Sequence, residues 1–190
     1  TTLFRSSGAS ILPLVATGKH GAAGRIAGLD GRAVRLRGTL ADVDGQALIE
    51  LADAPIEPLG DPTASAPDVR VESLGRHRLV GEIVDSKCHF GVMNPATGKV
   101  HRACAARCIS GGLPPALLLH DRAGRRAVLL LVDRAGRGVG RAVLDQVGLR
   151  VAIEGEVVRH GDLLVFAIDP DSIAPVPVDA GSAASRAEGT

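Results

Sequence analysis

Apolar and polar residues alternate over two neighbouring stretches of the chain, and this pattern predicts a β-hairpin near the N-terminus. The stretches are residues 33–40 and 46–51, with an Asp-Gly pair at positions 44–45 between them. Alternation of period two is typical of half-buried strands, and Asp-Gly is typical of a tight hairpin turn. We therefore assign residues 32–53 to an N-terminal β-hairpin.

Strand-like apolar patterns recur through the rest of the chain and predict a small closed β structure. They lie at residues 69–74, 79–84, 116–120, 127–132, 149–159 and 163–168. Gly81 and Gly155 fall inside two of these strands, where a glycine allows the sharp bend that a small barrel needs. We therefore expect a mainly β fold, a small OB-like Greek-key barrel of about five strands and one short helix, spanning residues 69–175.

Three further segments lack a strong periodic pattern and complete the predicted organisation. Residues 1–31 contain many helix and strand breakers and are interpreted as an extended N-terminal arm. Residues 54–68 are rich in proline and are interpreted as a linker. Residues 176–190 have the composition of a tail that does not order on its own. We expect both tails to bind other protein subunits.

All three cysteines of the chain lie in one stretch, between a predicted strand and a predicted helix. Residues 100–109 contain no proline or glycine and are followed closely by two consecutive glycines, which predicts a short helix with a glycine stop. On this helix His101, Cys104 and Cys108 are spaced three and four residues apart, so they share one face. Cys88 ends the preceding strand, and the intervening loop is long enough to return it over that face.

Three thiols and one imidazole form a complete tetrahedral ligand set for zinc, and thiolates also suit copper or iron–sulfur centres. One hypothesis is therefore a metal ion held by Cys88, His101, Cys104 and Cys108, with zinc preferred over iron–sulfur or copper. The alternative is a disulfide from Cys88 to Cys104 or Cys108, with the remaining cysteine buried. A reduced or redox-active thiol site is the third. The spacing matches neither a repeated Cys-x-x-Cys nor a haem attachment motif, so it does not decide among them.

Charged and polar residues beside Cys88 are candidates for a polar site next to the thiols. They are Asp85, Lys87 and His89. Adjacent charged residues at the end of a strand are usually solvated or salt-bridged, and we interpret these in that way. The chain contains no recognisable catalytic constellation, and its glycine-rich stretch at residues 136–140 lacks the Lys-Ser/Thr of a phosphate-binding loop. We therefore predict that the protein is not an enzyme.

Composition and charge narrow the range of partners. The net charge is +1, so no global attraction to nucleic acid or anionic lipid is expected. Single-strand binding needs aromatic stacking platforms, whereas this chain has three Phe and neither Trp nor Tyr. Its apolar runs are far shorter than the roughly 20 residues that span a bilayer. We expect no nucleic-acid partner, and membrane contact only indirectly or through an unseen N-terminal anchor.

A specific motif runs from residue 81 to residue 115. It reads Gly-Glu-Ile-Val-Asp-Ser-Lys-Cys over residues 81–88, and His-Arg-Ala-Cys-Ala-Ala-Arg-Cys-Ile-Ser-Gly-Gly-Leu-Pro-Pro over residues 101–115. This motif resembles a group of poorly characterised bacterial proteins, exported or membrane-linked, that have an OB-like barrel. The resemblance covers residues 78–175 and implies a location and a barrel. It implies no activity.

These observations leave several functions open. The chain begins with Thr1 in place of Met, which fits an export signal that has been removed, and we expect a periplasmic, membrane-associated protein. The first hypothesis is a non-catalytic accessory subunit of a larger membrane-associated redox or respiratory assembly on the extracytoplasmic side. The alternative is a metal-binding or electron-transfer module that uses the Cys3His site. A thiol–disulfide protein is the third.

Overall fold

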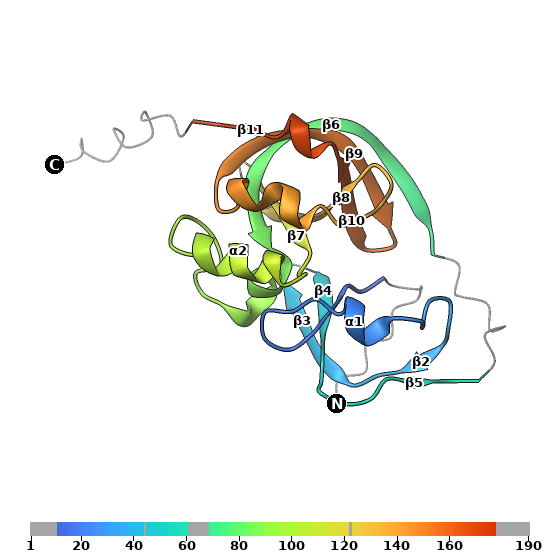
Figure 1. The fold of residues 1–190 in the computed structure, drawn as a ribbon. Coiled ribbons are helices and arrows are strands. Elements are labelled where there is room, and N and C mark those ends of the chain that lie inside the picture. Colours follow the sequence, from blue (N-terminus) through green and yellow to red (C-terminus); the bar gives the residue numbers. More distant parts are fainter. Residues whose placement is uncertain (1–10, 44, 61–68, 122, 178–190) are drawn as a thin grey trace.

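The computed structural model describes residues 11–43, 45–60, 69–121 and 123–177 (Figure 1). Strands hold 44% and helices 19% of these described residues, so the predicted mainly β class is confirmed. A small sheet built from the N-terminal elements lies below a larger sheet in the view of Figure 1, and the Cys/His stretch lies where the two meet. The larger sheet contains the strands predicted for residues 69–175.

The N-terminal sheet has the strand order β1-β4-β3. Its strands are β1 (Leu14–Val15), β3 (Gly38–Val43) and β4 (Gln46–Leu51). β3 and β4 pair in antiparallel register, with Val43 opposite Gln46, and β1 adds to β4 in parallel. The hairpin expected at residues 32–53 is thus present, although its first long strand begins at Gly38. Leu48 and Leu51 of β4 are both buried, and because they are three residues apart their side chains lie on opposite faces of the strand.

The other N-terminal elements are short. They are α1 (Ala23–Ile26), β2 (Val34–Arg35) and β5 (Glu57–Pro58), and β2 pairs with β5 in antiparallel fashion. Residues 11–31, predicted to be an extended arm, therefore contain a strand and a helical turn, and the predicted linker contributes a strand at Glu57–Pro58. Residues 1–10, 61–68 and 178–190, the remainder of the predicted arm, linker and tail, lie outside the described residues.

The larger sheet has six strands in the order β10-β8-β7-β6-β9-β11. They are β6 (Val71–Asp85), β7 (Pro115–His120), β8 (Arg126–Asp133), β9 (Arg150–His160), β10 (Leu163–Ile168) and β11 (Ala174–Pro175). β10 also pairs with β9, and this pairing closes a ring through β6, β7, β8, β10 and β9. Neighbours in the ring are antiparallel except for the parallel pair β8 and β10.

The ring is not a regular barrel. β6 pairs with β9 along most of its length, from Val71 to Glu82, but with β7 only from Glu82 to Asp85. The register between β6 and β9 also shifts between Ser73 and Gly75. The strands therefore wrap unevenly, and β11 continues the sheet outside the ring.

Gly81 and Gly155, predicted to be bends, lie where neighbouring strands approach closely. A Cβ atom on Gly81 would lie 2.5 Å from the carbonyl oxygen of Leu118. A Cβ on Gly155 would lie 2.4 Å from the carbonyl oxygen of Ala167. Both distances are too short for a side chain, so the close approach of the backbone of the neighbouring strand explains why glycine occupies each position.

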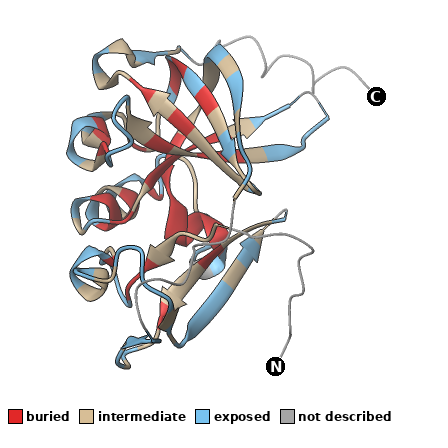
Figure 2. Cartoon of the chain, turned by 90° about the vertical axis from the view of Figure 1, so that its right-hand side faces the viewer, coloured by how far each residue is buried: buried red, intermediate tan, exposed pale blue. Residues whose placement is uncertain are grey.

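Buried residues form two clusters (Figure 2). The first fills the ring and includes Ile83, Leu117, Ile153 and Phe166. The second joins the ring to the N-terminal sheet, and it contains Val15, Leu48, Val84, Phe90, Leu113, Cys88 and Cys108 among its members. Two of the three cysteines are therefore part of the core that holds the two sheets together.

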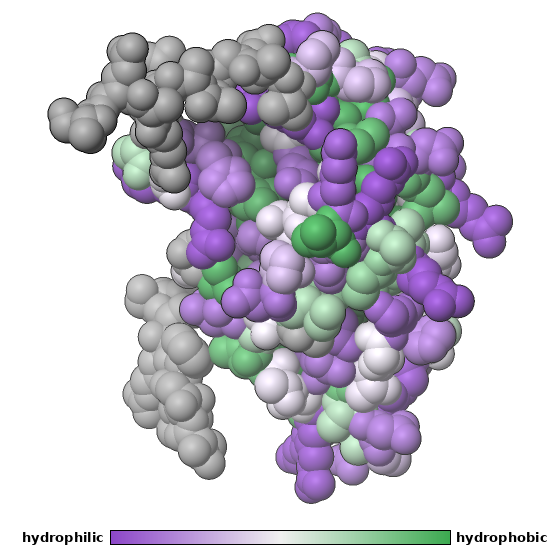
Figure 3. Space-filling model, turned by 90° about the vertical axis from the view of Figure 1, so that its left-hand side faces the viewer, coloured by the Kyte–Doolittle hydropathy of each residue, from purple (hydrophilic) through white to green (hydrophobic). Residues whose placement is uncertain are grey.

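Four helical segments complete the described chain. They are η1 (Cys88–Val92), α2 (Arg102–Ser110), η2 (Gly140–Gln146) and η3 (Pro170–Ser172). α2 is the helix predicted for residues 100–109, and η1 is an irregular turn kinked at Gly91. The face that carries α2 mixes hydrophilic and hydrophobic side chains (Figure 3). Within the described ranges, no helix combines the length and apolar character needed to cross a bilayer.

Candidate metal centre

The three cysteines come from two different helical segments and lie close together in the structure. Cys88 is the first residue of η1, directly after β6, and Cys104 and Cys108 lie one turn apart on α2. The sulfurs of all three lie within 4.8 Å of one another, and Cys88 Sγ is 4.0 Å from Cys108 Sγ. Helix periodicity and the returning loop thus bring the predicted thiol ligands together as expected.

The predicted disulfide is absent from this structure, in which all three cysteines are described and free. A disulfide needs a sulfur–sulfur distance of about 2.05 Å, roughly half of the 4.0 Å between Cys88 and Cys108. The spacing is instead that of separate thiols arranged around a common point, which suits ligands to one ion.

The thiols differ in their exposure to solvent. Cys88 and Cys108 are 4% and 2% exposed, whereas Cys104 is partly exposed. Burial raises the pKa of Cys88 above its usual range and raises the pKa of Cys108 to about 11, and the nearby Asp85 charge adds to both shifts. Without a bound metal ion these two thiols keep their protons at neutral pH. A metal ion would bind by displacing the two protons.

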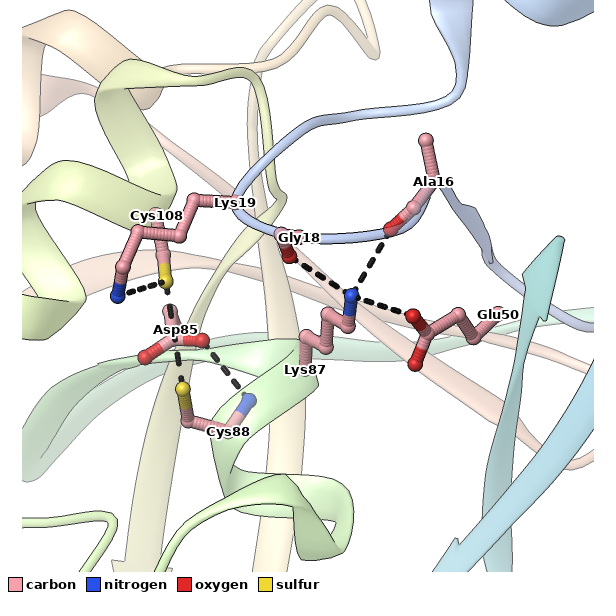
Figure 4. Close-up of polar contacts among 8 residues, drawn as sticks. All are labelled: Ala16, Gly18, Lys19, Glu50, Asp85, Lys87, Cys88 and Cys108. Atoms are coloured by element: carbon pink, nitrogen blue, oxygen red, sulfur yellow. Dashed lines mark hydrogen bonds and ion pairs between the residues drawn. The ribbon is translucent and has the colours of Figure 1, made fainter. Parts of the chain in front are cut away.

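A lysine from the N-terminal segment reaches the thiols. Lys19 Nζ donates a hydrogen bond to Cys104 Sγ at 2.8 Å. It also lies 3.7 Å from Cys108 Sγ (Figure 4). The hydrogen bond to Cys104 is the main reason that the pKa of Lys19 is raised. The sequence offered no local sign of this contact, because Lys19 lies 85 residues before Cys104.

Lys87, which precedes Cys88, anchors the same N-terminal segment. Its side chain is buried, and Nζ donates to the carbonyl oxygens of Ala16 at 2.9 Å and Gly18 at 2.7 Å (Figure 4). It also lies 2.9 Å from Glu50 Oε1. Lys87 is therefore salt-bridged, which was one of the two expected states. It is also buried, because the segment around Ala16 to Gly18 covers it.

The two glycines after α2 allow this segment to pack against the end of the helix. Gly21 N donates to the carbonyl oxygen of Gly111 at 2.9 Å. A Cβ on Gly111 would lie 1.8 Å from the Lys19 carbonyl oxygen, and a Cβ on Gly21 would lie 2.1 Å from the Gly112 carbonyl oxygen. The glycine pair predicted as a helix stop therefore also provides the space that brings Lys19 over the thiols.

Asp85 and His101 form a second group of donors that shares Cys88. Asp85 is fully buried; its Oδ1 accepts the backbone N–H of Cys88 at 2.8 Å, and its Oδ2 lies 3.2 Å from His101 Nε2. The donor atoms of Asp85, Cys88 and His101 lie within 4.8 Å of one another. The four predicted ligands therefore fall into two overlapping groups, and in this structure His101 faces Asp85 and Cys88 and not all three thiols. Asp85, interpreted as solvated or salt-bridged, is buried and paired.

The donor set defines what the site can hold. Three thiolates select soft or borderline metals such as zinc, copper or iron–sulfur centres over magnesium or calcium. The residues present fit such a group, since the three thiols are free and converge, and since buried Asp85 fixes both Cys88 and His101. Asp85 is thus placed to support the ligands in the way that outer carboxylates support metal-binding residues.

Comparisons with known proteins name no relative of this chain. A search of protein-family models, of curated proteins and of solved structures returned no match.

Proposed function

We propose that the protein is a non-catalytic metal-binding protein in which Cys88, Cys104 and Cys108 hold one zinc ion. The observation that carries this proposal is the convergence of three free sulfurs within 4.8 Å of one another at the junction of the two sheets. Thiols that merely filled the core would need no common point of convergence. An ion at that point would link η1 to α2 and so stabilise the junction.

The charges around the thiols favour a divalent ion. Three thiolates carry three negative charges, and the Lys19 ammonium beside Cys104 supplies one positive charge. With the buried Asp85 carboxylate counted as well, a divalent ion leaves the group with one negative charge, whereas a monovalent ion such as Cu(I) would leave two in a largely buried place. Zinc is divalent, accepts thiolate ligands and needs no redox partner.

His101 is the side chain that we propose for the fourth position. Zinc ligands of this type usually bond a carboxylate through their second ring nitrogen, and Asp85 already lies 3.2 Å from Nε2 of His101. Asp85 could hold the imidazole through Nε2 while Nδ1 is turned toward the ion. This arrangement would complete the Cys3His set predicted from the sequence.

Cobalt(II) is the probe that tests the ligand assignment, because its absorption reports the number of bound thiolates. We expect the reduced chain to bind one Co²⁺ with strong thiolate-to-metal absorption and to release it to Zn²⁺. Cys88→Ser and Cys108→Ser should weaken the absorption and the affinity, and His101→Ala should weaken the affinity with the thiolate absorption retained. Met93→Ser, which removes an exposed sulfur in the same loop, is the control. Equal binding by Met93→Ser and Cys108→Ser would refute the assignment.

We also propose that the ring is an OB-like Greek-key barrel, as the motif resemblance implies. The supporting observation is the closed order β6-β7-β8-β10-β9. In this order β9 pairs with β6, and β10 pairs with β8. A crystal structure in which β10 pairs with β9 but not with β8 would contradict this proposal. The resemblance to exported or membrane-linked bacterial proteins is supported by the motif alone.

A role as an accessory subunit of a membrane-associated redox or respiratory assembly outside the cytoplasm is the second function that we propose. It is favoured by an apolar cavity of about 340 Å³ between the hairpin and the ring, whose lining includes Ile11, Leu40, Phe90, Val128 and Leu163. Leu40 is also 40% exposed, so a partner's apolar side chain could cover it.

Native-gel mobility of the chain in mild detergent extracts of its source cells tests this second function. Leu40→Asp should shift the chain from a large complex to its own mass. Val100→Asp, at an exposed site outside the cavity, should leave the complex intact. Migration of the unaltered chain at the mass of a monomer would contradict the accessory role.

A further inference from the structure

One of the three thiols is chemically set apart from the others. Cys104 is partly exposed, whereas Cys88 and Cys108 are almost completely buried. Cys104 Sγ also accepts a hydrogen bond at 2.8 Å from the ammonium of Lys19, which is itself exposed. Accessible cysteines beside a lysine are the ones that react with oxidants. The most reactive sulfur and its two potential partners therefore lie in one group.

We propose that Cys104 is an oxidation site for hydroperoxides and that Cys88 converts the oxidised sulfur into a Cys88–Cys104 disulfide. The release of zinc by this reaction rests on the proposed function, whereas the formation of the disulfide does not. The sulfurs of Cys88 and Cys104 lie within 4.8 Å of each other, and they belong to different elements, η1 and α2.

The two steps balance with hydrogen peroxide as the oxidant. In the first, the Cys104 thiolate attacks one peroxide oxygen, the O–O bond breaks, and sulfenic acid and hydroxide form; sulfur is oxidised and peroxide is reduced. In the second, the Cys88 sulfur attacks the sulfenic sulfur, the S–O bond breaks, and a disulfide and water form, with the Cys88 thiol proton going into the water. The proton that the Cys104 thiol releases on forming the thiolate neutralises the hydroxide from the first step, so overall two thiols and one peroxide give one disulfide and two waters.

Helix geometry selects Cys88 over Cys108 as the partner. Cys104 and Cys108 lie four residues apart on α2. Their Cβ atoms are therefore held about 5–6 Å apart, whereas a disulfide needs roughly 3.5–4.5 Å between Cβ atoms. Cys88 lies on η1, which is short and kinked, and is not bound by that spacing. Cys108 should remain as the free thiol.

Lys19 positions the first step. Its ammonium lies beside the sulfur that attacks, so it can also donate a hydrogen bond to the departing peroxide oxygen. The close packing of Gly111 against the Lys19 backbone and the hydrogen bonds from Lys87 to the carbonyl oxygens of Ala16 and Gly18 hold the backbone of this segment in place, and the Lys19 ammonium is held by its hydrogen bond to Cys104. A disulfide between Cys88 and Cys104 would remove two of three thiolate ligands and so expel the ion.

Peptide mapping of the full chain tests the proposal. The reduced protein, metal-free or loaded with zinc, is treated with hydrogen peroxide, its remaining thiols are alkylated, and its peptides are identified by mass spectrometry. We expect a Cys88–Cys104 link with alkylated Cys108, and zinc release that follows the link in time. A Cys104–Cys108 link, or oxidation of Cys108 before Cys104, would overturn the proposal.

Variants separate the two steps and guard against misfolding. Cys88→Ser should accumulate Cys104 sulfenic acid that dimedone traps, and Cys108→Ser should still form the link. Lys19→Ala should slow the loss of the Cys104 thiol several-fold, whereas Lys99→Ala, at an exposed lysine on the loop before α2, should not. Equal rates for Lys19→Ala and Lys99→Ala would contradict the role of Lys19.

The outcomes also separate this proposal from the proposed function. A link that forms in a chain unable to bind zinc or cobalt would refute the metal site and support the oxidation site. If the chain keeps one zinc after peroxide treatment and the Cys104 thiol still reacts with the alkylating agent, the oxidation site is refuted and the metal site is supported.

Discussion

The ammonium of Lys87 lies 2.9 Å from Oε1 of Glu50 and joins the residue before Cys88 to the N-terminal hairpin. The Lys87 side chain is 4% exposed and that of Glu50 is 29% exposed, so this ion pair belongs to the junction between the sheets. Lys87 also bonds two carbonyl oxygens of the segment that carries Lys19. The Lys87 side chain thus connects the hairpin, the thiol site and residues 16–19, which cover that site and are called the covering segment below.

Loss of the Lys87 ammonium should destabilise the protein strongly. Lys87→Met keeps the length of the side chain but leaves Glu50 and two carbonyl oxygens without their donor. Removing one member of a buried ion pair costs about 3–5 kcal/mol, and the partial exposure of Glu50 places the expected loss near the lower limit. Urea unfolding measures the change, and Lys99→Met is the matched control. Similar unfolding midpoints for the two variants would show that the Lys87 contacts do not stabilise the junction.

Addition of one methyl group at Gly111 should displace the covering segment. The new Cβ would lie 1.8 Å from the Lys19 carbonyl oxygen, a backbone atom that cannot move alone. We expect Gly111→Ala to lower the free energy of unfolding by about 1–3 kcal/mol and to expose the thiols to alkylation. Gly138→Ala, where a Cβ meets nothing within 4 Å, is the control. Unchanged alkylation rates in Gly111→Ala would contradict the packing described here.

The stability of the metal-free, reduced protein should fall in alkaline solution. The folded state holds the Cys108 proton until about pH 11, whereas an unfolded thiol loses it near pH 9.0. The unfolded chain therefore binds fewer protons between these values, so the free energy of unfolding is full below pH 9.0 and falls by about 2 kcal/mol on the way to pH 11.

Urea unfolding with a reductant and a chelator present measures this pH dependence, and Cys108→Ser should reduce it. A residual slope from Cys88 is expected in that variant, because burial raises the pKa of Cys88 too. Stability that rises from pH 9.0 upward would contradict the buried, protonated state of the two thiols.

Local patterns predicted the elements of the fold better than their arrangement. The alternation in residues 46–51 and the glycine stop after α2 are set by neighbours in sequence, and both elements appear as expected. The uneven pairing of β6 with β7 and β9 depends on contacts between distant strands, which no local pattern encodes. β2 lies within the predicted strand at residues 33–40, but its pairing with β5 was not predicted, because β5 is only two residues long and lies in a proline-rich stretch.

The candidate site was predictable as far as helix periodicity reaches. The spacing of Cys104 and Cys108 placed them on one face, and the loop after Cys88 returned it to them. The positions of Lys19 and Glu50 could not be predicted, because they come from the N-terminal part of the chain and contact the motif only after the chain has folded. Asp85 and Lys87 were judged by their residue types, whereas tertiary packing buried and paired them.

The metal site is tested by elemental analysis of the purified, reduced full chain, combined with a count of its thiols under denaturing conditions. We predict one zinc per chain, with three thiols that react once the zinc has been removed. Cys108→Ser should retain less than the unaltered chain, and Met93→Ser should retain as much. A chain that carries no metal after exposure to zinc, although all three thiols are reduced and reactive, would contradict the claim that these cysteines form a metal site.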